Sequence, residues 1–559
     1  MTTVDRLVRQ QAPWLSWPGV VGLMAAVSAP LLLVSIPPLV DVPGHIATAS
    51  IAAAAPNSPL QNYYDWQWSL TPSLGSEVLL MLLQPLGSVA AGWWTSLIIL
   101  AVLTGGSIAA IRTLNPRGSH AIGLALVFVT GFSWVWGFLN FMLAAGLSLL
   151  VFAAALRLEM APRIRAAVLL GVTPLVFFCH AVGAALLPLL VAAAAVGQVL
   201  DDRTPLRRAP AILIRSCWPL LIWAPLLLLW QFTAPPNAPR NIDWDWLGKA
   251  DFLMEVLRDQ NALLDMGCVA LAYLLVLLGP LLGARWTWKL GLPALAVIIF
   301  YALSPAELNG SESVDTRLLS IGMILALGLQ DWSGARRPIA RAVLCGGLAL
   351  FVVRLIVAAH GFVAYNRDYH AELRALDHIA IGSKVLSFRE QPCSDLSWRM
   401  SRLDTLPAFA SSERQAWVNN HWTIPGLHML RERFSPAPGD PDRISPAVWD
   451  PRCPDSDGRT LDQILREAPL QRVDYVWLVD IGTPRVPIPG LKMIWHWRRS
   501  ALFAVTPGAG SPGATPATAT AITAGRTTGR AGAAPGPAPA IRPEPGRTPA
   551  PPPPGPIPG

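Results

Sequence analysis

The sequence predicts a mainly α-helical fold, a polytopic membrane bundle of about eleven spans followed by a small α/β domain. Two observations support this prediction. Of the 559 residues, 53% are hydrophobic and only 14% are charged, which is too apolar for an ordinary soluble protein. In addition, nearly uncharged stretches recur through the first two thirds of the chain, and a spanning helix needs about 20 such residues.

The predicted spans fill residues 17–362, after a short cytoplasmic N-terminus, residues 1–16. Their approximate bounds are 17–37, 90–112, 119–135, 138–156, 164–179, 181–200, 212–231, 266–284, 288–304, 318–331 and 340–362. The first span follows two arginines, as the apolar part of a signal peptide would. However, SIPPLVDVP comes after it instead of a small-residue cleavage site, so we expect a retained anchor.

The basic residues predict the orientation of the bundle, because short cytoplasmic loops retain Lys and Arg. With the N-terminus inside, the inner loops contain Arg112, Arg117, Arg157, Arg163, Arg165, Arg203, Arg207, Arg208, Arg215, Arg285, Lys289, Arg336, Arg337 and Arg341. The first outer loop has no Lys or Arg over residues 38–76, and the later outer loops contribute Arg240, Lys249, Arg258 and Arg317. The sequence therefore predicts an N-in, C-out topology. The net charge of +8 largely reflects this topology, and we do not read it as a nucleic-acid-binding surface.

Residues 363–505 have a mixed polar and apolar composition, with helix-like HAELRALDHIAIG and strand-like KVLSF and VDYVWLVDI. This is long enough for a small α/β domain with its own core, and the topology places it outside the cytoplasm. Residues 506–559 are dominated by Pro, Ala, Gly and Thr. Such a segment cannot bury enough apolar surface to offset its ordering entropy, so we expect a disordered tail.

Of the six cysteines, four lie in or beside predicted spans, where a cysteine ordinarily serves as a small apolar side chain. The other two, Cys393 and Cys453, both fall in the C-terminal domain. Two interpretations are open for this pair. They form a disulfide, which would stabilise the domain by roughly 4 kcal/mol in the chain-entropy model, or they are unrelated free thiols.

The stretch PPLVDVPGHIATAS, residues 37–50, places Asp41 and His45 four positions apart directly after the first predicted span. Residues four apart share one face of a helix, so the carboxylate and imidazole would face one ligand, or a divalent metal ion. The alternative is structural: Asp is a preferred N-cap and Pro is tolerated in the first turn of a helix. Capping alone explains neither His45 nor the absence of basic residues nearby.

The same loop contains QNYYDWQW, in which Tyr64 and Trp66 are candidate substrate-binding residues because aromatic faces stack on sugar rings. Trp and Tyr also gather at membrane interfaces, so an aromatic belt is the alternative. Three further candidates are His180, Asp315 and Arg317, which lie near the outer ends of spans. His180 would face a cavity or a partner there. Arg317 would hold a lipid-linked phosphate, or else reach toward the interface or pair with Asp315.

Arg354 lies inside the last predicted span and needs an internal partner or a wet cavity, so a structural ion pair and a substrate contact are both open. The sequence contains no P-loop, no G-x-G-x-x-G after a strand, no H-E-x-x-H and no C-x-x-C motif. Any chemistry is therefore expected to be assembled from separate loops at the outer face of the membrane.

Over about residues 10–365 the pattern resembles the GT-C superfamily of membrane glycosyltransferases. The resemblance rests on PPLVDVPGH, which puts Asp41 where that family has an acidic residue, and on a first outer loop, residues 38–89, of similar length with a short helical LGSEVLLMLLQPL. It is similar in particular to a poorly characterised bacterial branch. That branch has a D-x-P-x-H first loop, a histidine at a helical turn and an Asp-x-Arg before a late span.

The resemblance implies a bacterial cytoplasmic (inner) membrane protein that transfers a sugar from a polyprenyl-phosphate donor. In such an enzyme Asp41 would deprotonate the acceptor hydroxyl or help to bind a divalent metal. His45 or His180 would assist, and Arg317 would neutralise the departing lipid phosphate. Two other functions remain open from sequence, a membrane transporter or flippase and a non-catalytic scaffold of the cell envelope. The sugar, the acceptor and the oligomeric state cannot be read from the sequence.

Overall fold

The computed structural model describes residues 13–506, apart from residues 118, 392, 394–397 and 454–455. The described residues all belong to one compact unit of the chain. Most of the predicted cytoplasmic N-terminus and nearly all of the predicted tail therefore lie outside the described residues.

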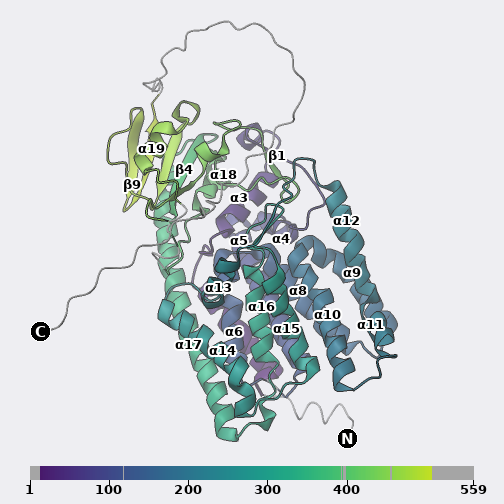
Figure 1. Cartoon of the computed structure of the whole chain (residues 1–559). Helices are drawn as coiled ribbons and strands as arrows, with labels where there is room; N and C mark the ends of the chain where they lie inside the picture. Colours follow the sequence, from purple (N-terminus) through teal and green to yellow (C-terminus); the bar gives the residue numbers. More distant parts are fainter. Residues whose placement is uncertain (1–12, 118, 392, 394–397, 454–455, 507–559) are drawn as a thin grey trace, which may run out of the picture. The chain divides into compact units, whose positions relative to one another are not determined.

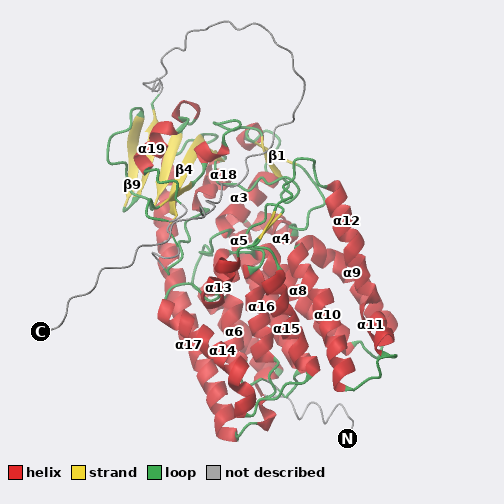
Figure 2. Ribbon diagram, in the orientation of Figure 1, coloured by secondary structure: helices red, strands yellow, loops and turns green. Residues whose placement is uncertain are grey.

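The described residues form α-helices and short strands in the order of the sequence (Figures 1 and 2). The α-helices are α2 (Trp17–Leu32), α3 (Val42–Ala52), α4 (Gly75–Leu83), α5 (Ser88–Leu114), α6 (Ile122–Val127), α7 (Phe132–Trp136), α8 (Leu139–Arg157), α9 (Pro162–Cys179), α10 (Ala181–Asp201), α11 (Ala209–Cys217), α12 (Trp223–Thr233), α13 (Trp246–Glu255), α14 (Ala262–Leu278), α15 (Trp288–Leu303), α16 (Thr316–Gly328), α17 (Arg337–Glu372), α18 (Phe409–Arg414) and α19 (Leu461–Glu467). The strands are β1 (Tyr64–Trp66), β2 (Ile242–Asp243), β3 (Glu307–Leu308), β4 (Lys384–Gln391), β5 (Trp417–Val418), β6 (Leu430–Glu432), β7 (Ala447–Trp449), β8 (Tyr475–Val479), β9 (Leu491–Trp497) and β10 (Ser500–Val505).

Among the described residues, seven helical stretches are long and apolar enough to cross a membrane, so the chain is a multi-pass membrane protein. They match seven of the predicted spans and are Ser88–Leu114, Leu139–Arg157, Pro162–Cys179, Ala181–Asp201, Ala209–Thr233, Ala262–Leu282 and Arg337–His378. The other four predicted spans are helical but shorter, at Trp17–Leu32, Ile122–Trp136, Trp288–Leu303 and Thr316–Gly328. The total of about eleven spans and the orientation stay predictions.

The predicted span at residues 119–135 is interrupted, and the interruption has a local cause. Gly131 follows a 3-10 turn and has extended backbone, which ends the first helical piece and starts α7. A Cβ at Gly131 would lie 2.8 Å from the Val256 carbonyl oxygen, so only glycine fits there. The second piece ends at Gly137, whose φ of +90° belongs to the left-handed region. This broken helix turns the chain toward the residues that follow the first span.

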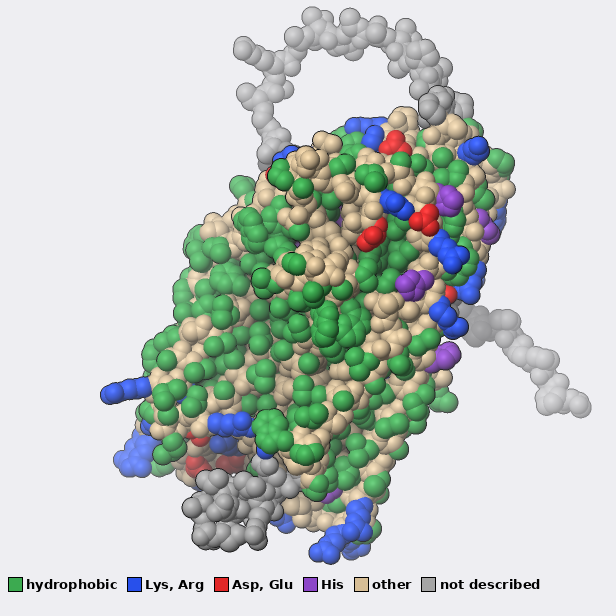
Figure 3. Space-filling view, turned by 180° about the vertical axis from the view of Figure 1, so that it is seen from behind, with side chains coloured by type: hydrophobic (Ala, Val, Ile, Leu, Met, Phe, Trp, Pro, Cys, Tyr) green, Lys and Arg blue, Asp and Glu red, His purple; other side chains and the backbone are tan. Residues whose placement is uncertain are grey.

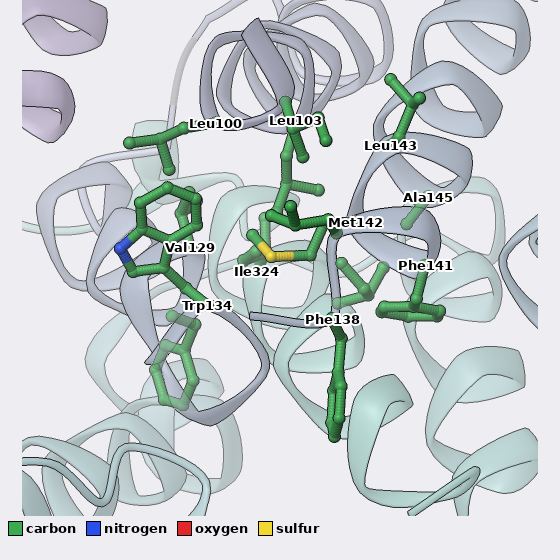
Figure 4. Close-up of a cluster of buried hydrophobic side chains, with 14 of the residues drawn as sticks. Leu100, Leu103, Val129, Trp134, Phe138, Phe141, Met142, Leu143, Ala145 and Ile324 are labelled. Carbon is green, nitrogen blue, oxygen red and sulfur yellow. The ribbon is translucent and has the colours of Figure 1, made fainter. Parts of the chain in front are cut away.

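The core of the bundle is apolar and closely packed. Figure 4 shows Leu100 and Leu103 of α5, Trp134 of α7, Met142 of α8 and Ile324 of α16 meeting in one buried cluster. In Figure 1, α8, α10, α15 and α16 lie side by side, in agreement with the contacts between these helices. Small residues bring some of the helices close together. For example, a Cβ on Gly106 of α5 would lie 2.4 Å from the carbonyl oxygen of Gly146 in α8.

After α17 the chain forms a six-stranded mixed sheet with the order β5-β4-β8-β10-β9, and β7 also pairs with β4. Strand β4 is parallel to β5, β7 and β8, whereas β10 is antiparallel to β8 and β9. A disulfide joins Cys393 and Cys453 in this part of the chain. The predicted first outer loop adds a separate ladder, because β1 pairs antiparallel with β6. The loop after the first helix and the C-terminal segment therefore pack against each other.

The surface agrees with a membrane protein. On the face shown in Figure 3, hydrophobic side chains cover a broad middle region, and Lys, Arg, Asp, Glu and His side chains gather toward the two ends. Large apolar side chains are exposed along the helices, for example Leu175 (66% exposed), Leu221 (69%) and Leu277 (73%). Exposed apolar surface of this extent is expected where helices contact lipid.

Candidate active site

A cavity of about 380 Å³, which we call the Asp41 cavity, lies where the outer loop meets the C-terminal segment. Its lining comes from four parts of the chain that are far apart in sequence. The polar and aromatic residues among them are Asp41, His45, Ser73, Glu77, Trp136, Phe138, Asn140, Phe141, His180, Ser311, Glu312, Ser313, Arg317, Arg389, Asp404, Thr405, Trp422 and His428. The structure thus brings together four of the candidates that the sequence singled out, Asp41, His45, His180 and Arg317.

The backbone before Asp41 is fixed by the broken helix. The amide of Val40 donates to the Val135 carbonyl (3.1 Å), and the amide of Asp41 donates to the Trp136 carbonyl (2.9 Å). Gly137 permits this contact, since a Cβ there would approach the Asp41 amide nitrogen to 3.1 Å. Asp41 occupies the N-cap position of α3, yet within the described part of the chain its side chain makes no capping hydrogen bond. The carboxylate faces the cavity instead.

The C-terminal segment fixes the other side of this turn. The Thr405 hydroxyl donates to the Val40 carbonyl and accepts from the Gly44 amide (3.2 Å). Gly44 also lies against Trp422, because a Cβ at residue 44 would be 2.7 Å from the indole ring. The middle of the D-x-P-x-H stretch is therefore a contact surface for the C-terminal segment, and its glycine is required by a close approach.

His45 belongs to a buried polar chain. Its Nδ1 lies 3.0 Å from Oε1 of Glu77 in α4, and the other carboxylate oxygen of Glu77 accepts from the Asn140 side chain (2.8 Å). The Asn140 oxygen in turn accepts from the amide of Ser76 (2.7 Å). Burial lowers the pKa of His45, but the hydrogen bond and the negative charge of Glu77 outweigh burial and leave this pKa above its usual value. The Glu77 carboxylate thereby favours the protonated imidazole, whose positive charge acts on Asp41.

Burial is the main influence on Asp41 and raises the pKa of its carboxyl group to about 7. The positive charges of His45, Arg317 and Arg389 oppose this shift, whereas the charge of Asp404 adds to it. A carboxylate with a near-neutral pKa is suited to accept a proton at physiological pH and release it afterwards.

His180 and Arg317 form a second pair in the cavity lining. Arg317 Nη1 lies 2.9 Å from Nε2 of His180, and since a guanidinium can only donate, Nε2 is the acceptor. Burial, and then the charge of Arg317, hold the pKa of His180 well below its usual value, so the ring is neutral. Its proton then sits on Nδ1. The 3.3 Å contact from the Gly183 amide to that nitrogen is therefore not a hydrogen bond in this tautomer.

Arg317 is also held by backbone carbonyls and by an aromatic ring. Its Nε donates to Ser313 (3.0 Å), its Nη2 donates to Glu312 (2.9 Å), and its guanidinium carbon lies 4.0 Å from the centre of the Phe138 ring. These contacts and the one to His180 use three of the five N–H groups, as far as the described residues show. The guanidinium is therefore oriented, and it has donors to spare for a ligand.

The C-terminal segment contributes a third set of residues. Arg389 of β4 pairs with Asp404 (Nη1 to Oδ2, 2.9 Å), and the rings of Trp422 and His428 are stacked with centroids 6.4 Å apart. Burial raises the pKa of Asp404 and lowers that of His428 to about 4. His428 is therefore neutral near pH 7.

The structure places the other candidates elsewhere. Asp315 caps α16 by accepting from the Thr316 amide (2.8 Å) and is paired with Lys249 in a buried contact. The Tyr64 hydroxyl is buried between the backbone groups of Val418, at 3.0 and 3.2 Å. Trp66 lies in β1 with its ring 5.7 Å from that of Trp68. Their substrate-binding role therefore stays a prediction without support from a cavity contact.

Arg354, for which an ion pair and a substrate contact were both open, is 4% exposed and lies 3.2 Å from Asp265 of α14. It also donates to the carbonyls of Leu257 (2.8 Å) and Thr130 (3.1 Å). These partners make it part of an internal network of the bundle.

A divalent metal was considered for Asp41 and His45. Among the residues that the structure describes, no group of three or more His, Cys, Asp or Glu side chains is arranged to hold a metal ion. The nearest carboxylate to His45, that of Glu77, already bonds His45 and Asn140. The residues of the cavity therefore do not fit a metal site, and no step below depends on one.

Sequence reasoning missed Glu77, Asn140 and the whole C-terminal part of the cavity. Glu77 carried a usable signal, because it is an acidic residue inside an apolar stretch of the first outer loop. Arg389, Asp404 and Trp422 carried none, since their approach to Asp41 depends on contacts more than three hundred residues apart in the chain.

No family model matches the sequence, and no curated protein matches it. Among solved structures, the chain is similar to the crystal structure of ArnT from Cupriavidus metallidurans bound to undecaprenyl phosphate. The two chains share 12% sequence identity and superpose with a TM-score of 0.44, over 92% of this chain and 100% of that chain.

Proposed function

We propose that the protein is an integral membrane glycosyltransferase that moves a sugar from a polyprenyl-phosphate donor to an acceptor hydroxyl at the extracytoplasmic face. One observation carries the proposal: a carboxylate with a pKa of about 7 and an oriented arginine line the same cavity. A proton acceptor and a fixed cation are the two groups that this reaction needs, because it deprotonates an alcohol and releases a phosphate.

In the proposed reaction the acceptor oxygen attacks the anomeric carbon of the donor sugar. Its proton passes to the Asp41 carboxylate, and a new C–O bond forms. The bond between the anomeric carbon and the phosphate oxygen breaks, and its electron pair leaves with the phosphate. The products are the glycosylated acceptor and polyprenyl phosphate. Positive charge on His45 favours the ionised form of Asp41 before the proton is transferred.

Arg317 is the proposed partner of the leaving phosphate. A guanidinium presents paired donors that match phosphate oxygens, and its charge offsets the charge that develops as the bond breaks. His180, Phe138 and the carbonyls of residues 312 and 313 hold it in place, so little reorganisation is needed during the reaction.

The placement at the extracytoplasmic face rests on the ends of the helices. The cavity lies at the start of α8, at the junction of α9 and α10, and at the start of α16. Arg157, Arg163 and Arg165 lie at the opposite ends of α8 and α9, where the sequence predicts cytoplasmic loops. An α-helix of 18 or 19 residues, the lengths of α9 and α8, spans about 28 Å, which is close to the thickness of the hydrocarbon core of a bilayer.

The test is turnover of radiolabelled polyprenyl-phosphate sugars by membranes that contain the protein. The Asp41→Asn variant should lose activity by roughly two to four orders of magnitude, because its side chain accepts no proton. Asp65→Asn is the matched control: it changes an acid of the same loop that is paired with Arg433 outside the cavity lining. Full activity of Asp41→Asn, or equal loss in both variants, would rule out Asp41 as the base.

A further inference from the structure

Glu77 is a buried acid in the apolar helix α4, and its two carboxylate oxygens have different partners. Oε2 accepts hydrogen bonds from the Asn140 side chain (2.8 Å) and from the Ser76 hydroxyl (3.1 Å). Oε1 lies 3.0 Å from Nδ1 of His45. Two neutral groups thus fix the carboxylate through one oxygen, and the other oxygen bonds the imidazole.

The Glu77 carboxylate is ionised at neutral pH. Burial raises its pKa, but the hydrogen bond and the charge of His45, together with the hydrogen bond from Asn140, outweigh burial and leave this pKa below its usual value. An ionised carboxylate can only accept, so the proton of this contact lies on Nδ1 of His45. Glu77 therefore fixes both the orientation of the His45 ring and the position of its proton.

Glu77 influences Asp41 through His45. Asp41 and His45 lie four residues apart and so share one face of α3. The charged groups that act most on Asp41 come from α3, α16 and the C-terminal segment, and they are His45, Arg317, Asp404 and Arg389. The charge of Glu77 acts instead on His45. The three residues thus form a chain in which the imidazole is the middle member.

The other groups around His45 and Glu77 do not supply this positive charge. His428 of the C-terminal segment is near both, but burial lowers its pKa to about 4, so it is neutral near pH 7. Cys179, at the end of α9, lies near Glu77, and a thiol is either neutral or negative. Trp422 packs on His45 with ring centroids 5.2 Å apart and does not titrate.

We propose that Glu77 is a positioning residue of the transfer reaction: it fixes the His45 ring through Nδ1 and favours the positive charge that acts on Asp41. This inference rests on the proposed function for the reaction and for the role of Asp41. It adds the residue that sets the pH range in which Asp41 serves as the base. Without Glu77, burial lowers the pKa of His45, Asp41 loses a positive neighbour, and its carboxyl group needs a higher pH to ionise.

A direct effect of Glu77 on Asp41 and an effect through His45 have opposite signs. Glu77→Gln removes a negative charge, and by the direct route Asp41 would then ionise at a lower pH. Through His45 the same variant removes a positive charge, and Asp41 then ionises at a higher pH. A purely structural role of Glu77 lowers activity at every pH and leaves the midpoint of the pH profile in place.

The first measurement is the pH profile of kcat/KM for sugar transfer by the full-length protein in nanodiscs. Glu77→Gln should move the midpoint upward from about 7 by about one pH unit, as expected for the loss of one nearby charge. Transfer at pH 6 should then be about tenfold slower than in the wild type, and nearly equal above pH 9. Glu77→Asp keeps the charge and should return the midpoint toward that of the wild type.

His45→Gln should reproduce the upward shift, and adding Glu77→Gln to it should move the midpoint no further upward, because both act on one chain. His45→Gln also tests the link where Glu77→Gln does not fold. Asp65→Asn is the matched control, since it changes an acid of the same outer loop that is paired with Arg433. Its midpoint should equal that of the wild type.

NMR titration of the protein with ¹³C-labelled histidine tests the same chain without an assay of activity. The His45 signal is identified by its absence in His45→Gln. Glu77→Gln should lower the measured pKa of His45, and Asp65→Asn should leave it unchanged. If this pKa falls and the wild type transfers no sugar, the proposed function is wrong and the link between Glu77 and His45 stands. An unchanged pKa of His45 in Glu77→Gln, or a midpoint of transfer that stays or falls, would overturn the proposal.

Discussion

Asp41 and Asp265 are both carboxylates that are largely removed from water, yet their surroundings differ. Asp265 lies 3.2 Å from Arg354, accepts from the Trp398 indole (3.0 Å) and accepts from the backbone amide of Asp259 (3.0 Å). Asp41 has cations nearby but points into a cavity and makes no cap. The comparison teaches that removal from water alone does not mark a functional acid. A buried carboxylate whose hydrogen bonds and ion pair are all formed stabilises the fold. A buried carboxylate that lacks them is available for chemistry.

The largest effect is expected from a substitution that removes the ion-pair partner of Asp265. Arg354→Met leaves Asp265 buried without its counterion, which costs about 3–5 kcal/mol in comparable cases. We expect a marked fall in the thermal unfolding midpoint of the purified protein. The double variant Arg354→Met/Asp265→Leu should recover much of the loss, because both charges are then gone. A single variant as stable as the wild type would show that the ion pair does not hold the bundle together.

At Asp41 we expect the opposite effect of a substitution on stability. Its folded pKa of about 7 lies above the unfolded value of 3.8, so the folded state binds the proton more tightly. Stability therefore falls as pH rises from 3.8 to about 7, by at most about 4 kcal/mol, and is constant above that range. Asp41→Asn removes this penalty. The variant should unfold at a higher temperature than the wild type at pH 8, with a smaller difference at pH 5. A lower midpoint at pH 8 would contradict a strained carboxyl group.

A smaller effect is expected from a substitution at the contact between Gly44 and Trp422. In Gly44→Ala the new methyl group meets the Trp422 ring at 2.7 Å, so the ring must move away from the cavity. Overpacking of this kind costs about 1–3 kcal/mol, and we expect about a tenfold loss of sugar transfer. Binding of undecaprenyl phosphate should change little. Gly22→Ala is the control, since a methyl group there meets nothing within 4 Å. Unchanged transfer in Gly44→Ala would show that the position of Trp422 is unimportant.

Hydropathy and charge predicted the helical membrane bundle because both are local properties of the sequence. The same signal missed the break at Gly131 and Gly137, which depends on the carbonyl of Val256 and on the turn at Asp41. Asp41 and His45 could be singled out as candidates because their spacing is local as well. Asp315 was singled out in the same way: its spacing to Arg317 was visible in the sequence, whereas its partner Lys249 lies 66 residues away.

The part of the cavity that the C-terminal segment lines could not be predicted from the sequence. Thr405 reaches the Asp41 turn across 365 residues, and no periodicity or motif encodes a contact over that distance. The disulfide between Cys393 and Cys453 is an intermediate case: composition left two interpretations open, and the structure forms the bond. Local pattern thus singled out Asp41 as a candidate, and only the fold showed which residues line the cavity with it.

The pH dependence of kcat/KM for sugar transfer tests the central claim most directly. If Asp41 is the base, it must be ionised, so kcat/KM should fall about tenfold per pH unit below its pKa of about 7 and level off above it. The Asp65→Asn control should follow the same curve. A profile that stays flat down to pH 5, where a carboxyl group of pKa about 7 is almost fully protonated, would contradict the account.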